Sequence, residues 1–312
     1  MKPYIFQIPD WIPVAGGRPI FSYGVMMGIS FILGWSLVVH LCRRDGIDGK
    51  KASSAMLVVV IASLIFARGM HFMSSPTAVF TIRNFFRFDE GGLVAYGGFI
   101  GGIGGSWLYM WWNDIDPWVW LDNAAAPMAL GLGVTRVGCF LFGCDYGVRT
   151  DSAWALRFPR WEDPDVAHWI KRSSPAFVDH YRNVADNVAI FSHSVHATQL
   201  YESLVGFVAF GVLLLWLPFK KFHGQVMLIF LAYYAVLRFG LESIRGDADR
   251  GDDVFMGMST SQFTSVLILI FISGLWYRLS KRGLYAAAGT STWTPTSPQT
   301  KKKKQKRKKA SK

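Results

Sequence analysis

Apolar runs as long as a membrane span alternate with short polar segments along most of the chain. A helix of about 20 apolar residues crosses a bilayer. Seven stretches of roughly that length are present, at residues 21–42, 52–71, 91–112, 118–142, 199–219, 224–244 and 261–280. The pattern predicts an all-α, polytopic membrane protein with seven transmembrane helices.

Two polar segments lie outside this pattern. Residues 143–198 are rich in Asp, Arg, Pro and Trp, which makes the segment too polar to insert and too long for a plain turn. It predicts a small extracytoplasmic cap. Residues 285–312 contain mainly small and basic residues, a composition typical of a disordered tail. The remainder, residues 1–284 with the cap included, forms the expected membrane domain.

Basic residues between the spans predict the orientation. Lys and Arg concentrate in cytoplasmic loops, and three basic segments fall on one side of the seven-span arrangement. These are RRDGIDGKK at 43–51, FKKFHG at 219–224 and the run at 301–309. We therefore expect an extracytoplasmic N-terminus and a cytoplasmic C-terminus.

Composition agrees with a membrane protein and argues against nucleic-acid binding. Hydrophobic residues make up 51% of the chain and charged residues only 17%. The net charge is +12, but residues 301–312 carry nine Lys and Arg and no acid. No basic stripe with interleaved aromatic residues accompanies this tail. The expected partner of the tail is therefore anionic lipid.

Three cysteines are too few for a disulfide framework. The spacing of Cys139 and Cys144 matches no familiar zinc pattern. We expect the cysteines to pack as small apolar residues, and no metal site is predicted.

Polar side chains inside the spans converge at one depth. At about 1.5 Å per helical residue, five different helices place them in the outer half of the membrane. They are Tyr23, Arg68, His71, Tyr96, Arg136, Arg238, Glu242 and Arg245. Scattered structural charges would occupy both halves, so the convergence predicts a cavity that opens toward the outer leaflet.

Two interpretations of the sixth span remain open. Arg238, Glu242 and Arg245 lie at i, i+4 and i+7, on one helix face, where they could form an internal ion-pair network. With Arg68 and Arg136 added, however, arginine outnumbers the single intramembrane carboxylate Glu242. The site is then expected to keep positive charge and to bind an anion, because the arginine fork suits phosphate oxygens.

The third span begins GGLVAYGGFIGGIGG, with eight glycines in fifteen residues. Glycines at this spacing usually allow close helix packing, the interpretation we give to Gly101 and Gly105. Gly97 and Gly98, directly after Tyr96, are candidates for substrate access, because adjacent glycines let the backbone approach a ligand.

Taken together, the motifs resemble those of the prolipoprotein diacylglyceryl transferase family over residues 18–280. The matching segments are SYG at 22–24, GGLVAYGG at 91–98, RVGCFLFGCDYG at 136–147, HATQLYE at 196–202 and RFGLESIR at 238–245. The specificity comes from the order and spacing of all five.

The resemblance implies an enzyme of the bacterial inner membrane. That family moves the diacylglyceryl group of phosphatidylglycerol onto the thiol of a lipobox cysteine in a prolipoprotein and releases glycerol phosphate. No metal or soluble cofactor is implied. The catalytic residues would be Tyr23, Tyr96, Arg136 and Arg238. The substrate-binding residues would be Arg136, Arg238, Glu242, Arg245, Gly97, Gly98, Gly147 and His196. By the same resemblance, His196, Gln199, Tyr201 and Glu202 would fix the cap and the fifth span.

This chain departs from the family at the base and on the acceptor side. Tyr96 stands where the family usually has histidine, and a phenol is a poor base at neutral pH. Thr135, Cys139, Phe142 and Cys144 replace a glycine, two asparagines and a glutamate, although Cys144 with Asp145 could supply a thiol or an acid. Two alternatives therefore stay open: a transferase with another acceptor, and a non-enzymatic protein that binds or transports anionic lipids.

Overall fold

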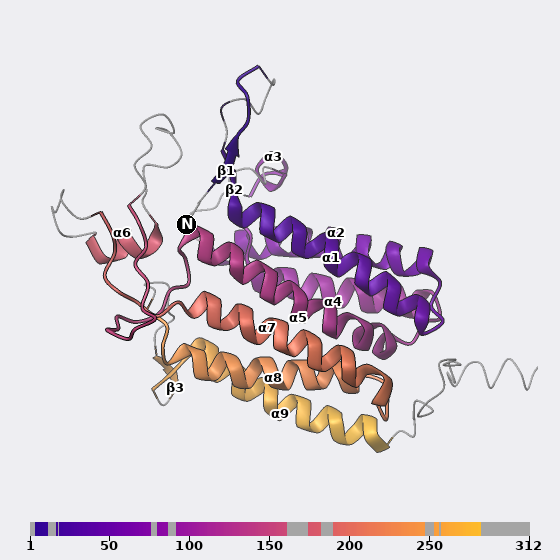
Figure 1. Cartoon of the computed structure of the whole chain (residues 1–312). Coiled ribbons are helices and arrows are strands. Elements are labelled where there is room, and N and C mark those ends of the chain that lie inside the picture. Colours follow the sequence, from indigo (N-terminus) through magenta and orange to yellow (C-terminus); the bar gives the residue numbers. More distant parts are fainter. Residues whose placement is uncertain are drawn as a thin grey trace, which may run out of the picture. The chain divides into compact units, whose positions relative to one another are not determined.

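The computed structural model describes residues 4–11, 17, 19–75, 80–86, 92–160, 174–181, 190–246, 253–255 and 257–281. The predicted tail at 285–312 lies outside these residues. Seven long helices carry the fold (Figure 1). They are α1 (Ser22–Arg44), α2 (Gly49–Ser74), α4 (Ala95–Trp112), α5 (Pro117–Phe142), α7 (Thr198–Trp216), α8 (Gln225–Glu242) and α9 (Thr260–Lys281).

Shorter elements connect them. α3 (Ile82–Phe85) and α6 (Pro175–Tyr181) are short helices, and a 3₁₀ turn covers Leu217–Phe219. β1 (Tyr4–Gln7) pairs with β2 (Pro19–Phe21), and β3 (Asp253–Phe255) pairs with β4 (Met258–Ser259), both antiparallel.

Among the described residues, six helices are long and apolar enough to cross a membrane: α1, α2, α5, α7 with its 3₁₀ extension, α8 and α9. The helical, polytopic fold class is therefore confirmed. The predicted third span appears as α4, which has the length but is not one of the six. Glycine and tryptophan fill half of its positions and lower its mean hydropathy. A seventh span through α4 stays a prediction.

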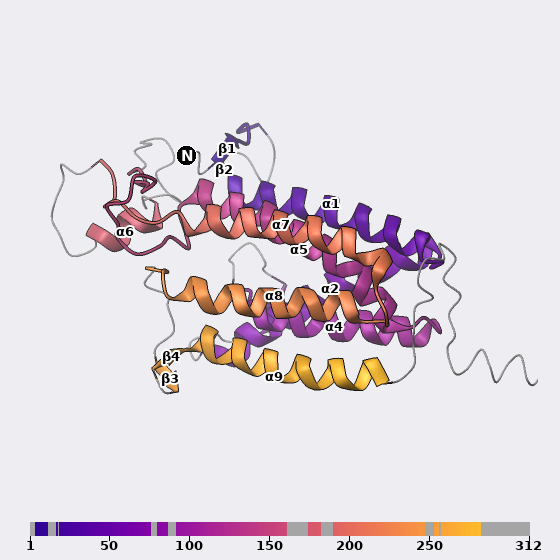
Figure 2. The same cartoon turned by 60° about the horizontal axis from the view of Figure 1, so that its bottom comes forward.

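Contacts divide the chain into two compact units. The first unit comprises the described residues within Met1–Gly34, Ala125–Lys220 and Gln225–Gly283, and the second comprises those within Trp35–Ala124 and Lys221–Gly224. In the first unit, α8 packs against both α7 and α9 (Figures 1 and 2). Each unit has its own close helix contacts.

In the first unit, glycine permits a close crossing of α5 and α7. A methyl group added at Gly206 would lie 2.7 Å from the backbone nitrogen of Gly133. Beside it, Ser203 Oγ donates a hydrogen bond to the Gly133 carbonyl oxygen at 2.8 Å. Because the two helices cross so closely here, the adjacent turns of α5 and α7 also lie near each other.

In the second unit, α4 packs on α2 through its glycines. A side chain at Gly97 or Gly101 would collide with the carbonyl groups of Phe66 or Ala62. One at Gly105 would lie 2.8 Å from Ala62 Cβ. The packing interpretation of Gly101 and Gly105 is thus confirmed, and Gly97 makes the same kind of contact.

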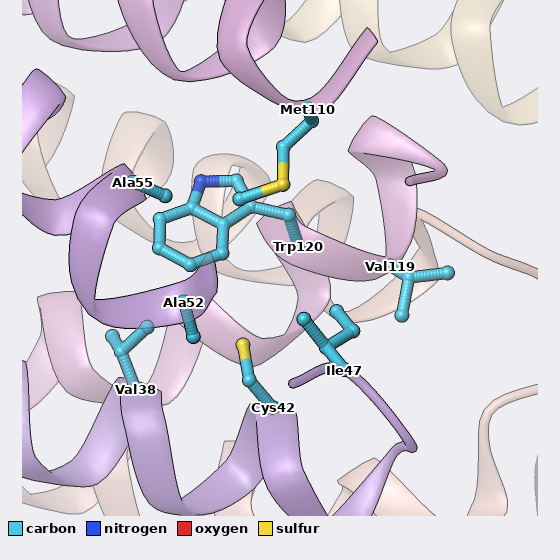
Figure 3. Close-up of a cluster of buried hydrophobic side chains, with 8 residues drawn as sticks. All are labelled: Val38, Cys42, Ile47, Ala52, Ala55, Met110, Val119 and Trp120. Atoms are coloured by element: carbon cyan, nitrogen blue, oxygen red, sulfur yellow. The ribbon is translucent and has the colours of Figure 1, made fainter. Parts of the chain in front are cut away.

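The second unit contains a cluster of buried hydrophobic side chains (Figure 3). It contains Val38, Cys42, Ile47, Ala52, Ala55, Met110, Val119 and Trp120. Cys42 is fully buried among these side chains, as expected for a small apolar residue.

The described parts of residues 143–197 form a folded loop, here called the head loop. Isolated antiparallel bridges join Arg149 and Leu156 to Val195 and Pro159 to Phe191. Its core contains Tyr146, Phe158, Ala176 and Val195. These contacts order the described residues of the head loop, and the extracytoplasmic cap stays a prediction.

His180 lies in the head loop in surroundings that favour the neutral imidazole. Its Nδ1 accepts a hydrogen bond from the His193 backbone N–H at 3.2 Å, which a protonated nitrogen cannot do. Burial, the charge of Arg149 and the neighbouring His193 lower the pKa of His180 to about 4.

Acidification from pH 6.5 to pH 4 should therefore loosen the head loop. In this window an unfolded imidazole, with a pKa of about 6.5, takes up a proton and the folded one does not. The stabilisation is complete above pH 6.5 and falls as the pH drops toward 4. Hydrogen exchange at residues 190–196, corrected for its intrinsic pH dependence, should accelerate across the window. His180→Asn should remove this effect, and a flat wild-type profile would contradict the prediction.

Candidate active site

Arg136 of α5 is held between two carboxylates. Its Nε lies 2.6 Å from Glu202 Oε2 of α7, and its Nη1 lies 2.9 Å from Asp145 Oδ2. The close crossing at Gly133 and Gly206 brings Glu202 to this position, and its side chain is only 2% exposed. A buried carboxylate needs such a partner to remain charged.

Two further arginines come from the end of α8. Arg238 Nη2 lies 2.9 Å from Glu242 Oε2 and donates a hydrogen bond to Ser261 Oγ of α9 at 3.0 Å. Arg245, just past the helix, donates from Nη2 to Asp145 Oδ1 at 2.6 Å. Glu202 also interacts electrostatically with Arg238 and Arg245. These residues form one arginine–carboxylate cluster: Arg136, Asp145, Glu202, Arg238, Glu242 and Arg245.

A tight turn after α5 aims Asp145 back toward the arginines. Gly143 has φ +85° and Asp145 has φ +56°, so the chain reverses through two left-handed residues. Gln199 and Thr198, in the first turn of α7, donate to the carbonyl oxygens of Cys144 and Asp145, both at 2.6 Å. The N-terminus of α7 therefore fixes the turn.

The charges around Asp145 favour its ionised form. Burial alone raises the pKa of this carboxyl group, but Arg136 and Arg245 outweigh it and hold the pKa below its ordinary value. The pKa of the Cys144 thiol is raised, first by its hydrogen bond with Cys139 and then by burial. Without another ligand, this thiol stays protonated.

Gly147 and His196 join three backbone segments beside the cluster. Gly147 forms an antiparallel bridge with Arg245 and donates its N–H to the His196 carbonyl oxygen at 2.9 Å. A Cβ on Gly147 would lie 2.6 Å from His196 Cβ and 2.9 Å from the Ile244 oxygen. The His196 ring contacts the Tyr201 hydroxyl at 3.2 Å. Both residues thus position the backbone that carries Arg245.

Tyr23 joins the same site from α1. Gly138 of α5 allows this approach, because a side chain there would lie 3.3 Å from Tyr23 Cα. Tyr23 interacts electrostatically with Cys139, Cys144, Asp145 and Arg136. Of the residues predicted from sequence, the structure therefore brings Tyr23, Arg136, Gly147, His196, Arg238, Glu242 and Arg245 together in the first unit.

The predicted surplus of positive charge is wrong. Three arginines of the cluster face three carboxylates, because Asp145 and Glu202 join Glu242. Sequence reasoning assigned Glu202 only to fixing the fifth span and gave Asp145 no firm role. An acidic residue inside the apolar run of α7 was the available signal for Glu202.

Several buried polar atoms near the cluster have no hydrogen-bond partner among the described residues. They include a donor, Arg238 Nη1, and two acceptors, Glu202 Oε1 and Gln199 Oε1. Glu242 Oε2 also lacks an aligned hydrogen bond, despite its ion pair with Arg238. A buried polar group that makes no hydrogen bond costs free energy. Their chemistry matches a ligand that carries both an anionic oxygen and hydroxyl groups.

The other predicted residues belong to the second unit. Tyr96 is 57% exposed in the first turn of α4, directly before Gly97 and Gly98. Arg68 donates to the carbonyl oxygens of Asn84, Gly92 and Phe85, at 2.7, 3.1 and 3.2 Å. Arg68 thus binds backbone rather than adding to the arginine–carboxylate cluster, and the roles of Tyr96, Gly97 and Gly98 stay predictions.

Comparison with known proteins identifies the family of this chain. A family model described as prolipoprotein diacylglyceryl transferase matches residues 9–278. Phosphatidylglycerol–prolipoprotein diacylglyceryl transferase 2 of Clostridium perfringens is 30% identical over 81% of this chain and 89% of its own length. The enzymes named phosphatidylglycerol–prolipoprotein diacylglyceryl transferase in Clostridioides difficile and Paraburkholderia phymatum are 27% and 28% identical, over 74% and 91% of this chain and 81% and 99% of their own lengths. The chain therefore belongs to the prolipoprotein diacylglyceryl transferase family, a family of transferases of lipoprotein biosynthesis.

Proposed function

We propose that this protein transfers the diacylglyceryl group of phosphatidylglycerol to the thiol of a lipobox cysteine in prolipoproteins and releases glycerol phosphate. The names of its relatives support these substrates. The observation that carries the proposal is the arginine–carboxylate cluster, in which a buried guanidinium nitrogen has no hydrogen-bond partner among the described residues.

The phosphate group would bind to Arg238 and Arg136. Arg238 Nη1 is the donor left open for a phosphate oxygen. Neighbouring carboxylates hold both guanidinium groups in place by ion pairs. Groups already fixed in this way need no reorganisation when charge develops during the reaction.

The glycerol of the headgroup would bind next to the unpaired hydrogen-bond acceptors of the same site. Glu202 Oε1 and Gln199 Oε1 are buried acceptors without donors. Hydroxyl groups can supply those donors. This pairing predicts a preference for phosphatidylglycerol over lipids whose headgroup ends in a quaternary amine, which has no hydrogen to donate.

The reaction then consists of one displacement. The thiolate sulfur of the acceptor cysteine attacks the carbon of the diacylglyceryl group that is bonded to the phosphate oxygen. A C–S bond forms and the C–O bond to phosphate breaks. The electron pair of that bond goes to the phosphate oxygen, where Arg136 and Arg238 stabilise the added charge. The thiol proton goes to solvent, and glycerol phosphate leaves.

We also propose the bacterial cytoplasmic membrane as its location, with an extracytoplasmic N-terminus and a cytoplasmic C-terminus. The basic segments between α1 and α2 and after α7 support this orientation through the positive-inside rule. The arginine–carboxylate cluster then lies toward the leaflet that faces secreted precursors.

A reconstituted transfer reaction tests the function. Purified protein is incubated with phosphatidylglycerol and a synthetic lipobox peptide, and the peptide mass is measured. We expect a diacylglyceryl adduct on cysteine, none on a peptide with serine in its place, and little with phosphatidylcholine. Bound phosphatidylglycerol without an adduct would instead favour a transferase with another acceptor. Movement of lipid across proteoliposomes without chemical change would favour a transport protein.

Tyr96→His should keep transfer activity or increase it. An imidazole with an unperturbed pKa of about 6.5 is a better base near neutral pH than a phenol with a pKa of about 10. As the pH is raised, the rate of transfer should therefore begin to increase at a lower pH in the variant than in the wild type. Tyr96→Phe, which keeps the ring and removes the hydroxyl group, is the control and should be slower. An inactive but folded Tyr96→His protein would show that the site depends on the phenol.

A further inference from the structure

Two thiols and a carboxylate meet beside the arginine–carboxylate cluster. Cys139 lies in the last turn of α5, and Cys144 and Asp145 lie in the turn that follows. One ligand atom from each residue lies within 4.8 Å of the other two. Cys144 Sγ is 3.6 Å from Asp145 Oδ2, and Cys139 is buried. None of the steps proposed above uses either thiol.

The spacing of these atoms fits a tetrahedral zinc ion. With Zn–S near 2.3 Å and Zn–O near 2.0 Å, tetrahedral ligand atoms lie roughly 3.5 to 3.8 Å apart. The Cys144–Asp145 distance already has this value. Shifts of about 1 Å would bring the other two ligand–ligand distances into the same range. Three protein ligands leave the fourth position open, which is the arrangement of catalytic zinc sites.

We propose that Cys139, Cys144 and Asp145 bind a zinc ion whose open position takes the thiol of the acceptor cysteine as a thiolate. The metal site stands on its own geometry, whereas the role of its open position rests on the function proposed above.

The charges around the site accommodate the metal. Zinc binding releases the two thiol protons, so one divalent cation replaces two protons and the net charge of the cluster is unchanged. Arg136 and Arg245 then act as outer-shell donors to the ligating Asp145 carboxylate, as they already do at 2.9 and 2.6 Å. Metal-binding carboxylates are usually hydrogen-bonded in this way.

This site would supply the deprotonated thiol that the displacement needs. A thiol bound to zinc loses its proton outright, so the acceptor would need no strong base from Tyr96. The zinc-bound sulfur forms the C–S bond as the C–O bond to phosphate breaks. The resulting thioether is neutral, binds zinc weakly and is released.

Metal content is the first test and does not depend on activity. The full-length protein, purified in the presence of zinc, should retain one zinc ion per chain. With cobalt it should show a sulfur-to-cobalt charge-transfer band. Cys139→Ala and Cys144→Ala should lose both signals, whereas Cys144→His should keep the metal. Cys42→Ala, which alters a thiol buried in the second unit, is the matched control and should behave like the wild type.

Thiol labelling tests the same site in the unaltered chain. Cys144, which is the more exposed of the two thiols, should resist a maleimide until a chelator is added. Absence of bound metal, or a Cys139–Cys144 disulfide detected by mass in the purified protein, would overturn the proposal. If the alanine variants fail to fold, the wild-type cobalt spectrum and labelling still decide it.

A chelator separates the metal from the function. Removal of zinc should reduce transfer to the lipobox peptide at least tenfold, zinc should restore it, and binding of phosphatidylglycerol should not change. Retained metal without any transfer would refute the proposed function and leave the zinc site standing. Full transfer by a metal-free protein would refute the role of the open position.

Discussion

Arg136→Ala should abolish diacylglyceryl transfer, with a rate loss of at least about 1,000-fold. The guanidinium group contacts Asp145 and Glu202 at 2.9 and 2.6 Å and is placed to stabilise charge on the departing phosphate. Removal of a single preorganised donor costs about 100- to 1,000-fold in other enzymes. Here the change also leaves Glu202, only 2% exposed, without its closest partner. The measurement is the rate of adduct formation on the lipobox peptide.

The loss of a buried partner could unfold the protein, so stability must be measured separately. Breaking a buried ion pair costs about 3 to 5 kcal/mol. The double variant Arg136→Ala with Glu202→Gln removes both charges and should recover much of this stability but none of the activity. Arg278→Ala, at an exposed arginine of α9 in the same unit, is the matched control and should be fully active. Activity retained by Arg136→Ala would refute the phosphate site.

Arg238→Lys should lower the rate of transfer by about 100-fold while the protein stays folded. Lysine keeps the positive charge beside Glu242, but it lacks the planar fork whose Nη1 is open for a phosphate oxygen. The expected loss corresponds to one preorganised donor. The defect should appear in kcat and in the affinity for phosphatidylglycerol in detergent micelles.

A second substitution gives Arg238 its control. Ser261→Ala removes only the hydroxyl group that accepts from Arg238 Nη2 at 3.0 Å, so it should cause a much smaller loss. Equal losses of rate in Arg238→Lys and Ser261→Ala would mean that the planar guanidinium group of Arg238 has no special role in binding the phosphate. Unchanged binding of phosphatidylglycerol in Arg238→Lys would place this arginine outside the phosphate site.

The pattern of apolar residues predicts most of the fold, because burial in lipid demands long apolar helices whatever their neighbours. The six described helices that are long and apolar enough to cross a membrane therefore lie within a few residues of the predicted spans. α4 is the exception. Its glycines serve contact with α2 rather than contact with lipid, and they weaken the hydropathy signal by which a span is recognised.

The site was only partly predictable for a different reason. Arg238 and Glu242 form an i, i+4 pair, which helical periodicity reveals directly. The partner of Arg136 on α7 lies more than sixty residues away, and periodicity says nothing about such pairs. Asp145 reaches both arginines only because of left-handed backbone at Gly143 and Asp145, which no spacing rule anticipates.

The ion pair between Arg136 and Glu202 has a consequence for how the protein is made. The ribosome synthesises α5 with its arginine well before α7 with its glutamate, and at typical elongation rates the interval lasts several seconds. During that time, the guanidinium group of Arg136 has only Asp145 as a counter-ion, and α7 has not yet fixed the turn that carries Asp145. By contrast, α8 carries its own pair and enters the membrane already neutralised. Nascent chains stalled before residue 202 should therefore hold α5 near the translocon, and chains stalled after α7 should release it into the lipid.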